Sequence, residues 1–131
     1  MKKPNIKEKK DKLKGIKGWL ILPVIHMFYY IVVYLYDLSE YPWGLDGNIL
    51  WELVLIDVIG IALVIVTLTL AFKEKRPAKN FFIVSYIFVI VVNIFTFMIT
   101  SDESLLSGSF GAIIWIWYFS VSKRVKNTFV K

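Results

Sequence analysis

Residues 50–72 read LWELVLIDVIGIALVIVTLTLAF, and this stretch decides the fold class of the chain. As an α-helix that rises about 1.5 Å per residue it would be about 34 Å long, enough to cross a hydrocarbon core of about 30 Å. Its apolar residues surround the helix axis and do not form the single stripe of a surface helix. Lys73 ends the run and opens a short basic segment. We therefore predict that residues 50–72 span a membrane.

Three more apolar runs predict three more membrane spans. They lie at about residues 19–36, 80–100 and 105–121. The connection after the first run contains Pro42, Gly44 and Gly47, which are typical of turns. Because the connections are short, neighbouring spans should run antiparallel. The sequence predicts an all-α membrane protein, an antiparallel up-down four-transmembrane-helix bundle.

The chain should fold as one transmembrane domain, residues 19–121, between two basic segments. Residues 1–18 form a basic arm, which we expect either to lie at the membrane interface as a short helix or to remain a solvated tail. Residues 122–131 form a basic tail. The 131-residue chain is 57% hydrophobic, above the roughly 45–50% of soluble domains. It contains no cysteine, which excludes disulfides, thiolate metal sites and a cysteine nucleophile.

The distribution of charge predicts the orientation. The 16 lysines and arginines fall into three groups, at residues 2–17, 73–79 and 123–131, which four crossings bring to one side. The other two connections carry only acidic charges. By the positive-inside rule both termini should be cytoplasmic. The net charge of +6 therefore indicates contact with anionic lipid headgroups or a partner, and not with nucleic acid. The expected contact residues, with simple membrane anchoring as the alternative, are Lys73, Arg76, Lys123, Arg124 and Lys126.

Polar residues inside the spans should form two layers. At about 1.5 Å per residue, Asp57 lies about 12 Å and Asn93 about 10 Å below the outer surface, with Trp115 at a similar depth. His26 lies about 12 Å above the inner surface, near the level of Tyr118. A lone histidine does not make a zinc site, which needs three or four protein ligands, and we expect no cofactor.

Asp57 is the strongest pointer to function. A carboxylate in hydrocarbon costs at least about 2.5–3.5 kcal/mol on insertion scales unless it is paired or neutralised. Asp57 should therefore face the bundle interior or a wet cavity, either protonated or hydrogen-bonded to Asn93. One interpretation is a proton-coupled or lipid-binding site that also uses His26. The other is a buried polar clasp that holds the helices in register. Trp115 and Tyr118 either line a cavity or pack in the core.

Small residues recur every four positions in the fourth span, at Ser104, Gly108 and Ala112. This pattern allows two helices to approach closely, either within the bundle or between two copies of the chain.

The sequence contains no nucleophile–base pair, glycine-rich phosphate loop, pair of catalytic carboxylates or HExxH motif, so we expect no enzymatic activity. Our first hypothesis is an accessory or interaction subunit of a membrane complex, which contacts another membrane protein or a second copy of the chain. The alternative is a small proton-coupled transporter or lipid-binding protein that uses Asp57, Asn93 and His26.

Two segments of the chain resemble a known family. Residues 15–23 read GIKGWLILP, and residues 114–129 read IWIWYFSVSKRVKNTF. They are similar to the G-x-x-G-W-L opening and the W-x-P-Y-F…S-x-R-V-K-x-T-F ending of the bacterial family grouped as domain of unknown function 2569. Trp117 stands where that ending has proline. The resemblance implies four spans in a bacterial cytoplasmic membrane and no established activity, so no functional residue is carried over from it.

Overall fold

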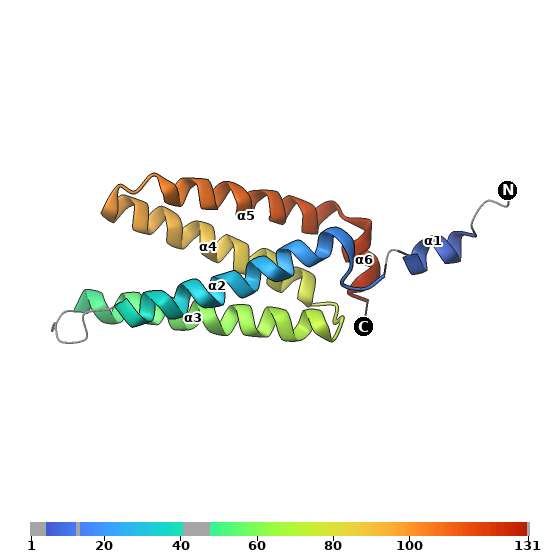
Figure 1. The fold of residues 1–131 in the computed structure, drawn as a ribbon, viewed down its shortest axis with the longest axis horizontal. Helices are drawn as coiled ribbons and strands as arrows, with labels where there is room; N and C mark the ends of the chain where they lie inside the picture. The colour runs from blue at the N-terminus through green and yellow to red at the C-terminus, as the bar shows by residue number, and fades with distance from the viewer. Residues whose placement is uncertain (1–4, 13, 41–47, 131) are drawn as a thin grey trace.

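The computed structural model describes residues 5–12, 14–40 and 48–130. Four long helices make up most of it (Figure 1): α2 (Ile21–Glu40), α3 (Asn48–Phe72), α4 (Ala78–Thr100) and α5 (Ser104–Val121). The short elements are α1 (Ile6–Lys12), the 3₁₀ turn η1 (Gly18–Leu20) and α6 (Lys123–Thr128). No strand occurs within these described ranges.

The predicted fold class is confirmed. Each of the four long helices is long and apolar enough to cross a membrane, the first together with η1. The first of these helices extends beyond the predicted end at residue 36 and reaches Glu40. Pro23 lies in the first turn of α2, where a missing backbone N–H breaks no helical hydrogen bond. The turn expected around Pro42, Gly44 and Gly47 lies outside the described residues.

The connections on either side of α4 show how the sequence reverses the chain. Glu74, with φ of 50°, follows α3, and Pro77 directly precedes α4. Ser101 ends α4 in the left-handed conformation, with φ of 57°. Asp102 Oδ1 then accepts a hydrogen bond of 2.9 Å from the Ser104 N–H at the start of α5. Hydrogen bonds from the Ser104 side chain and backbone lower the pKa of Asp102, which favours its charged form.

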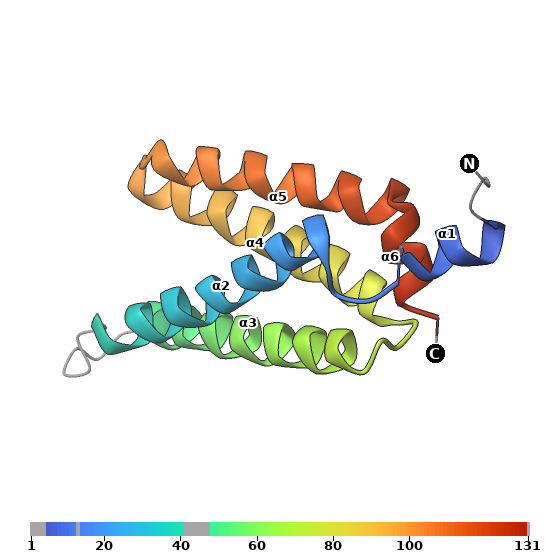
Figure 2. The same cartoon turned by 45° about the vertical axis from the view of Figure 1, so that its right-hand side comes forward.

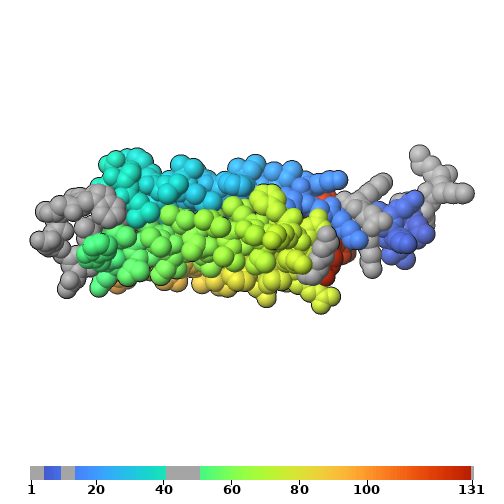
Figure 3. Space-filling view, turned by 90° about the horizontal axis from the view of Figure 1, so that it is seen from below, coloured from blue at the N-terminus to red at the C-terminus, as the bar shows by residue number. Residues whose placement is uncertain are grey.

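The helices are joined in sequence, each packed against the next: α2 on α3, α3 on α4 and α4 on α5. Figure 3 shows α2 and α3 side by side along one face. Figures 1 and 2 show the α2–α3 pair and the α4–α5 pair separating toward the end where α2 leads into α3. At the opposite end lie the α3–α4 connection, α6 and both chain termini. We call these the acidic end and the basic end, after the charges of their connections.

The hydrophobic core is densest at the basic end. Leu20, Phe82 and Phe119 are fully buried there, and the rings of Phe82 and Phe119 stack with centroids 4.3 Å apart. Outside the core, most of each helix faces outward, since between 17% and 28% of each span is buried. The outward side chains are mainly aliphatic and aromatic, as a lipid-facing surface requires.

The C-terminal segment, residues 122–131, which we predicted as a basic tail, contains a short helix. Residues 123–128 form α6, whose N-terminus is capped by Ser122, the side chain of which accepts a hydrogen bond from the Val125 N–H at 3.4 Å. Val125 and Phe129 are buried, and the Phe129 ring lies 6.2 Å from that of Phe82. Val125 and Phe129 therefore pack α6 against the bundle at the basic end, and we call this packed segment the α6 plug.

Candidate functional site

A cavity of about 470 Å³ lies between the helices toward the acidic end. This volume falls within the roughly 300–1,000 Å³ of small-molecule sites. Its lining comes from all four long helices: Tyr30, Val33, Tyr34, Asp37 and Glu40 of α2, Leu53, Ile56 and Asp57 of α3, Val89, Val92, Asn93 and Thr96 of α4, and Leu105 of α5. The separation of the two helix pairs thus leaves a hollow that side chains do not fill.

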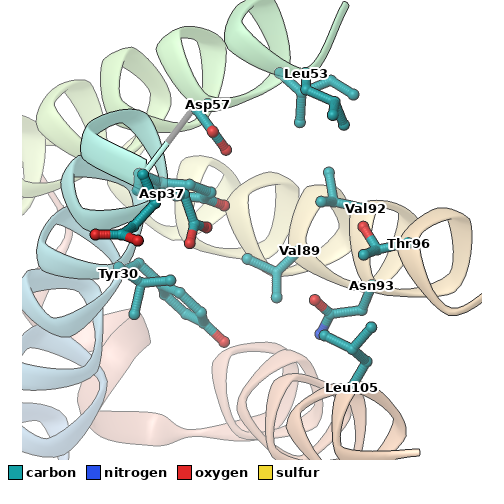
Figure 4. A pocket seen from close by; sticks show the side chains of 13 residues that line it. Tyr30, Asp37, Leu53, Asp57, Val89, Val92, Asn93, Thr96 and Leu105 are labelled. Carbon is teal, nitrogen blue, oxygen red and sulfur yellow. The ribbon is translucent and has the colours of Figure 1, made fainter. Parts of the chain in front are cut away.

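Asp57 is the buried acid of this cavity. Only 5% of the Asp57 surface is exposed. The residue lies about 14 Å along α3 from Asn48, the first residue of that helix. Figure 4 shows its side chain extending from α3 and that of Asn93 extending from α4 toward the space between the helices. The cavity therefore brings together Asp57 and Asn93 of the predicted outer layer, but not Trp115.

Two further carboxylates, Asp37 and Glu40, belong to the same lining and are exposed, at the last turns of α2. Among the described lining residues none is Lys, Arg or His. The cavity thus has a buried acid, two outer acids and no compensating side-chain cation in its wall. Neither outer acid was predicted as a site residue, because Asp37 and Glu40 follow the predicted end of the first span at residue 36.

Asn93 uses its amide to join α4 to α5. Its Nδ2 donates to Ser109 Oγ at 3.4 Å, so the structure gives it a partner other than the expected Asp57. A Cβ on Gly108 would lie 3.4 Å from Asn93 Nδ2, an ordinary contact distance, so Gly108 lies directly beside the amide. Of the other small residues, Ala112 is fully buried and Ser104 is exposed. Gly108 and Ala112 therefore lie in the contact between α4 and α5.

Tyr30 and Tyr34 form the aromatic wall of the cavity, and sequence analysis missed both. Each is at most 9% exposed, and their ring centroids lie 6.3 Å apart. The ring of Tyr34 rests on Gly60, where an added Cβ would come within 2.7 Å of the Tyr34 Cζ. Gly60 lies one turn beyond Asp57 on α3, so this contact holds the phenol close to the carboxylate. The i, i+4, i+8 spacing from His26 was a signal that these rings share one helix face.

His26 does not line the cavity, but its ring contacts that of Tyr30, which does. Its ring centroid is 4.6 Å from that of Tyr30, and its Nδ1 lies 3.5 Å from the Tyr86 hydroxyl. The Tyr86 hydroxyl also donates to the Pro23 carbonyl at 3.4 Å. The predicted neighbour Tyr118 instead packs edge-on against Trp115, with ring centroids 5.9 Å apart. Neither Trp115 nor Tyr118 is among the residues that line the cavity.

A buried hydroxyl pair ties α3 to α4 on the basic side of the cavity. Thr67 Oγ1 lies 2.9 Å from Ser85 Oγ and donates to the Leu63 carbonyl at 2.7 Å. Thr67 Oγ1 also lies 3.4 Å from the Phe81 carbonyl of α4, so this hydroxyl contacts α4 at two oxygen atoms.

The two motif segments meet at the basic end. The Thr128 hydroxyl donates to the Gly15 carbonyl at 3.4 Å, and the Arg124 guanidinium lies against Gly18, 3.7 Å from where a Cβ would be. Gly15 and Gly18 have φ of 85° and 58°, a conformation that favours glycine. The G-x-x-G opening and the S-x-R-V-K-x-T-F ending therefore form one contact, although they lie at opposite ends of the chain.

Both segments fall within a single family match, which covers residues 13–130 and is described as protein of unknown function (DUF2569). The chain belongs to this family. The resemblance of the two motif segments is thereby confirmed. No curated protein and no solved structure matches the chain.

The five basic residues that we expected to contact lipid or a partner fall, in this DUF2569 protein, into two arginines that contact the chain ends and three exposed lysines. Arg76 Nε donates a hydrogen bond to the Val130 carbonyl at 2.9 Å, which joins the α3–α4 connection to the C-terminal segment. Arg124 is half-buried against Gly18, which joins α6 to the segment before α2. Lys73, Lys123 and Lys126 are exposed at the same end. In the part of the chain that the structure describes, no three histidine, cysteine or acidic side chains are grouped as a metal site requires.

Proposed function

We propose that this DUF2569 protein is a non-enzymatic membrane protein that binds a small molecule in the cavity around Asp57. The observation that carries the proposal is the position of that carboxylate, 5% exposed in the wall of a cavity of about 470 Å³. A buried polar clasp needs a partner but no adjoining space, whereas a binding site needs both. The cavity therefore favours a transporter or lipid-binding protein that uses Asp57 over the polar clasp.

We further propose that the protein lies in the bacterial cytoplasmic membrane with both termini in the cytoplasm. The positive-inside rule supports this orientation, because the connection between α3 and α4 and both chain ends carry all the lysines and arginines. The cavity then lies toward the outer surface. A thiol reagent should label Lys75→Cys only from the cytoplasmic side, and labelling from the outside would contradict the orientation.

The closed basic end supports a transport cycle in which the bound molecule enters from the outer side. Phe82, Phe119 and Phe129 fill the space between the cavity and the cytoplasm, so release inward requires the α6 plug to move. Asp57 would carry either the ligand or a proton. In proteoliposomes, Asp57→Asn should then abolish the pH-dependent flux of the bound molecule across the membrane. An unaltered flux would contradict proton coupling.

Filling the cavity tests the binding function itself. Val92→Trp adds an indole to the lining, while Ile59→Trp places the same group on the outward face of α3, where Ile59 is 51% exposed. Native mass spectrometry of protein released from its own membranes should detect a small molecule on the unmodified chain and on Ile59→Trp, and none on Val92→Trp. The same molecules on all three chains would contradict the proposal.

A second candidate function, an accessory subunit, is supported by α5. Only 17% of this span is buried, and Phe110 and Trp117 are 69% and 64% exposed. Such a face fits lipid, a membrane-protein partner or a second copy. Cross-linking from a photoreactive residue at Phe110 in cells should capture a protein, and capture of lipid alone would remove this candidate.

The exposed lysines at the basic end support a minor role in lipid contact. We propose that Lys73, Lys123 and Lys126 meet anionic headgroups, each contributing about 1 kcal/mol.

A further inference from the structure

We infer that the ligand of the cavity is an organic cation with an apolar body, such as a quaternary ammonium compound. This inference rests on the proposed function, that is, on the cavity being a binding site. It adds the chemical class of the ligand, which follows from the charges and surfaces of the wall.

The sign of the charge follows from the lining. Three carboxylates, Asp37, Glu40 and Asp57, belong to the wall, and the described lining residues include no Lys, Arg or His. The charges of this wall repel an anion, and a carboxylate in a low-dielectric site attracts a cation. The two outer acids are exposed and the third is buried, so a cation would pass from the exposed carboxylates to Asp57.

The remaining wall distinguishes an organic cation from a metal ion. Calcium requires six to eight oxygen ligands, and magnesium binds with near-octahedral geometry. No metal-binding group of three His, Cys, Asp or Glu side chains occurs in the described ranges. Much of the wall is instead aliphatic: Val33, Leu53, Ile56, Val89, Val92 and Leu105. Those side chains would bury an apolar body and give a hydrated ion nothing.

The two tyrosines support the same class. Tyr30 and Tyr34 both line the cavity, and Figure 4 shows the Tyr30 ring on the same side as Asp37. Aromatic faces attract cations within about 6 Å of the ring centre, and quaternary ammonium groups are recognised in this way. Because the ring of Tyr34 is seated on Gly60, one turn from Asp57, a ring and a carboxylate can act on one cationic group together.

Two ligands of the same shape separate charge from fit. Benzyltrimethylammonium carries the cation, and neopentylbenzene has carbon in place of nitrogen and no charge. Binding of each to the full chain in lipid nanodiscs is measured by equilibrium dialysis, with empty nanodiscs subtracted. The unmodified chain should bind the cation saturably and at least about tenfold more tightly than the neutral analogue.

The variants assign that preference to Asp57. Asp57→Asn should weaken cation binding by about tenfold or more and leave the neutral analogue within about twofold, and Asp57→Glu should keep most of the affinity. Glu52→Gln removes the same charge from an exposed position of α3 outside the cavity and should change neither ligand. An unchanged elution profile of each variant in detergent establishes that it is folded. If Asp57→Asn is not folded, the double variant Asp37→Asn with Glu40→Gln takes its place, because it removes the two exposed charges of the wall and should weaken binding of the cation but not of the neutral analogue.

The outcomes distinguish the two proposals. Equal binding of both ligands, or a cation affinity that removal of the carboxylate charge leaves unchanged, overturns the cationic class and leaves the cavity as a binding site. Saturable binding of neither ligand to the unmodified chain overturns the cavity as a binding site, and the inference falls with it.

Discussion

Gly60 and Tyr34 illustrate how one missing side chain shapes the site. A Cβ at Gly60 would lie 2.7 Å and 2.9 Å from two atoms of the Tyr34 ring, closer than any normal contact. Tyr34 is only 6% exposed, so its ring has little space into which to move. The glycine therefore sets how closely α2 and α3 approach beside Asp57.

We predict that Gly60→Ala destabilises the protein. Overpacking costs about 1–3 kcal/mol, and the better helix propensity of alanine returns at most about 1 kcal/mol. Thermal unfolding in mild detergent measures the change. Gly111→Ala is the matched control, because a Cβ at Gly111 in α5 meets nothing within 4 Å and should leave the unfolding temperature unchanged or raise it. A Gly60→Ala protein as stable as the Gly111→Ala protein would show that Tyr34 is not confined.

At the scale of helices, the hydroxyl pair Thr67–Ser85 is the most specific link between α3 and α4. Both residues are buried, and their oxygens lie 2.9 Å apart. Hydrogen bonds between membrane helices contribute about 0.6 kcal/mol on average and at most about 1.7 kcal/mol.

A double-mutant cycle measures this link. Thr67→Val and Ser85→Ala should each destabilise the protein, and their coupling energy should be about 0.6–1.7 kcal/mol. Thr69→Val is the control on the same helix, since the exposed Thr69 hydroxyl bonds only within α3, to the Ile65 carbonyl at 2.8 Å. Its coupling to Ser85→Ala should be close to zero. Additive effects of Thr67→Val and Ser85→Ala would mean that the two hydroxyls do not interact.

The plug formed by α6 makes a separate prediction. Phe129 is 6% exposed and packs on Phe82, whereas the neighbouring Val130 is 44% exposed. Phe129→Ala should cost about 3 kcal/mol or more of stability, and Val130→Ala should have little effect. Phe129→Ala should also speed trypsin cleavage after Lys123 and Lys126 by freeing the segment. Equal cleavage rates in the two variants would contradict the packing of α6.

The sequence predicted some elements well because hydropathy reports directly on lipid exposure. The run from Leu50 to Phe72 is apolar on all sides, so both its length and its class could be predicted. The short helix α6 could not, because Val125 and Phe129 stand among charged residues and become buried only through contact with the bundle. The end of α2 was missed for a similar reason, since Asp37 looks like a loop residue until it is seen in the wall of a cavity.

At the scale of the whole molecule, the position of the site follows from how the helix pairs separate. The pairs diverge toward the acidic end and converge on an aromatic core and α6 at the basic end (Figure 2). The position of each residue along its span predicted, from sequence alone, that Asp57 and Asn93 lie at the same depth. The rotation of each helix about its axis could not be predicted from the position of a residue along its span. His26 was therefore expected near Tyr118, whereas its Nδ1 lies beside the Tyr86 hydroxyl.

The central claim is that a cavity open to water reaches the level of Asp57 from the acidic end. The chain has no cysteine, so single cysteines can be introduced without removing others. Ile56 lines the cavity, whereas Ile59 is 51% exposed on the outward face of the same helix. A thiol reacts as the thiolate, which needs a hydrated site.

The decisive measurement is the rate at which a membrane-impermeant cationic thiol reagent, added outside, modifies each cysteine in intact cells. Ile56→Cys should react and be protected by benzyltrimethylammonium, while Ile59→Cys, in lipid, should not react. An unreactive Ile56→Cys, or equal rates at the two positions, would contradict the central claim.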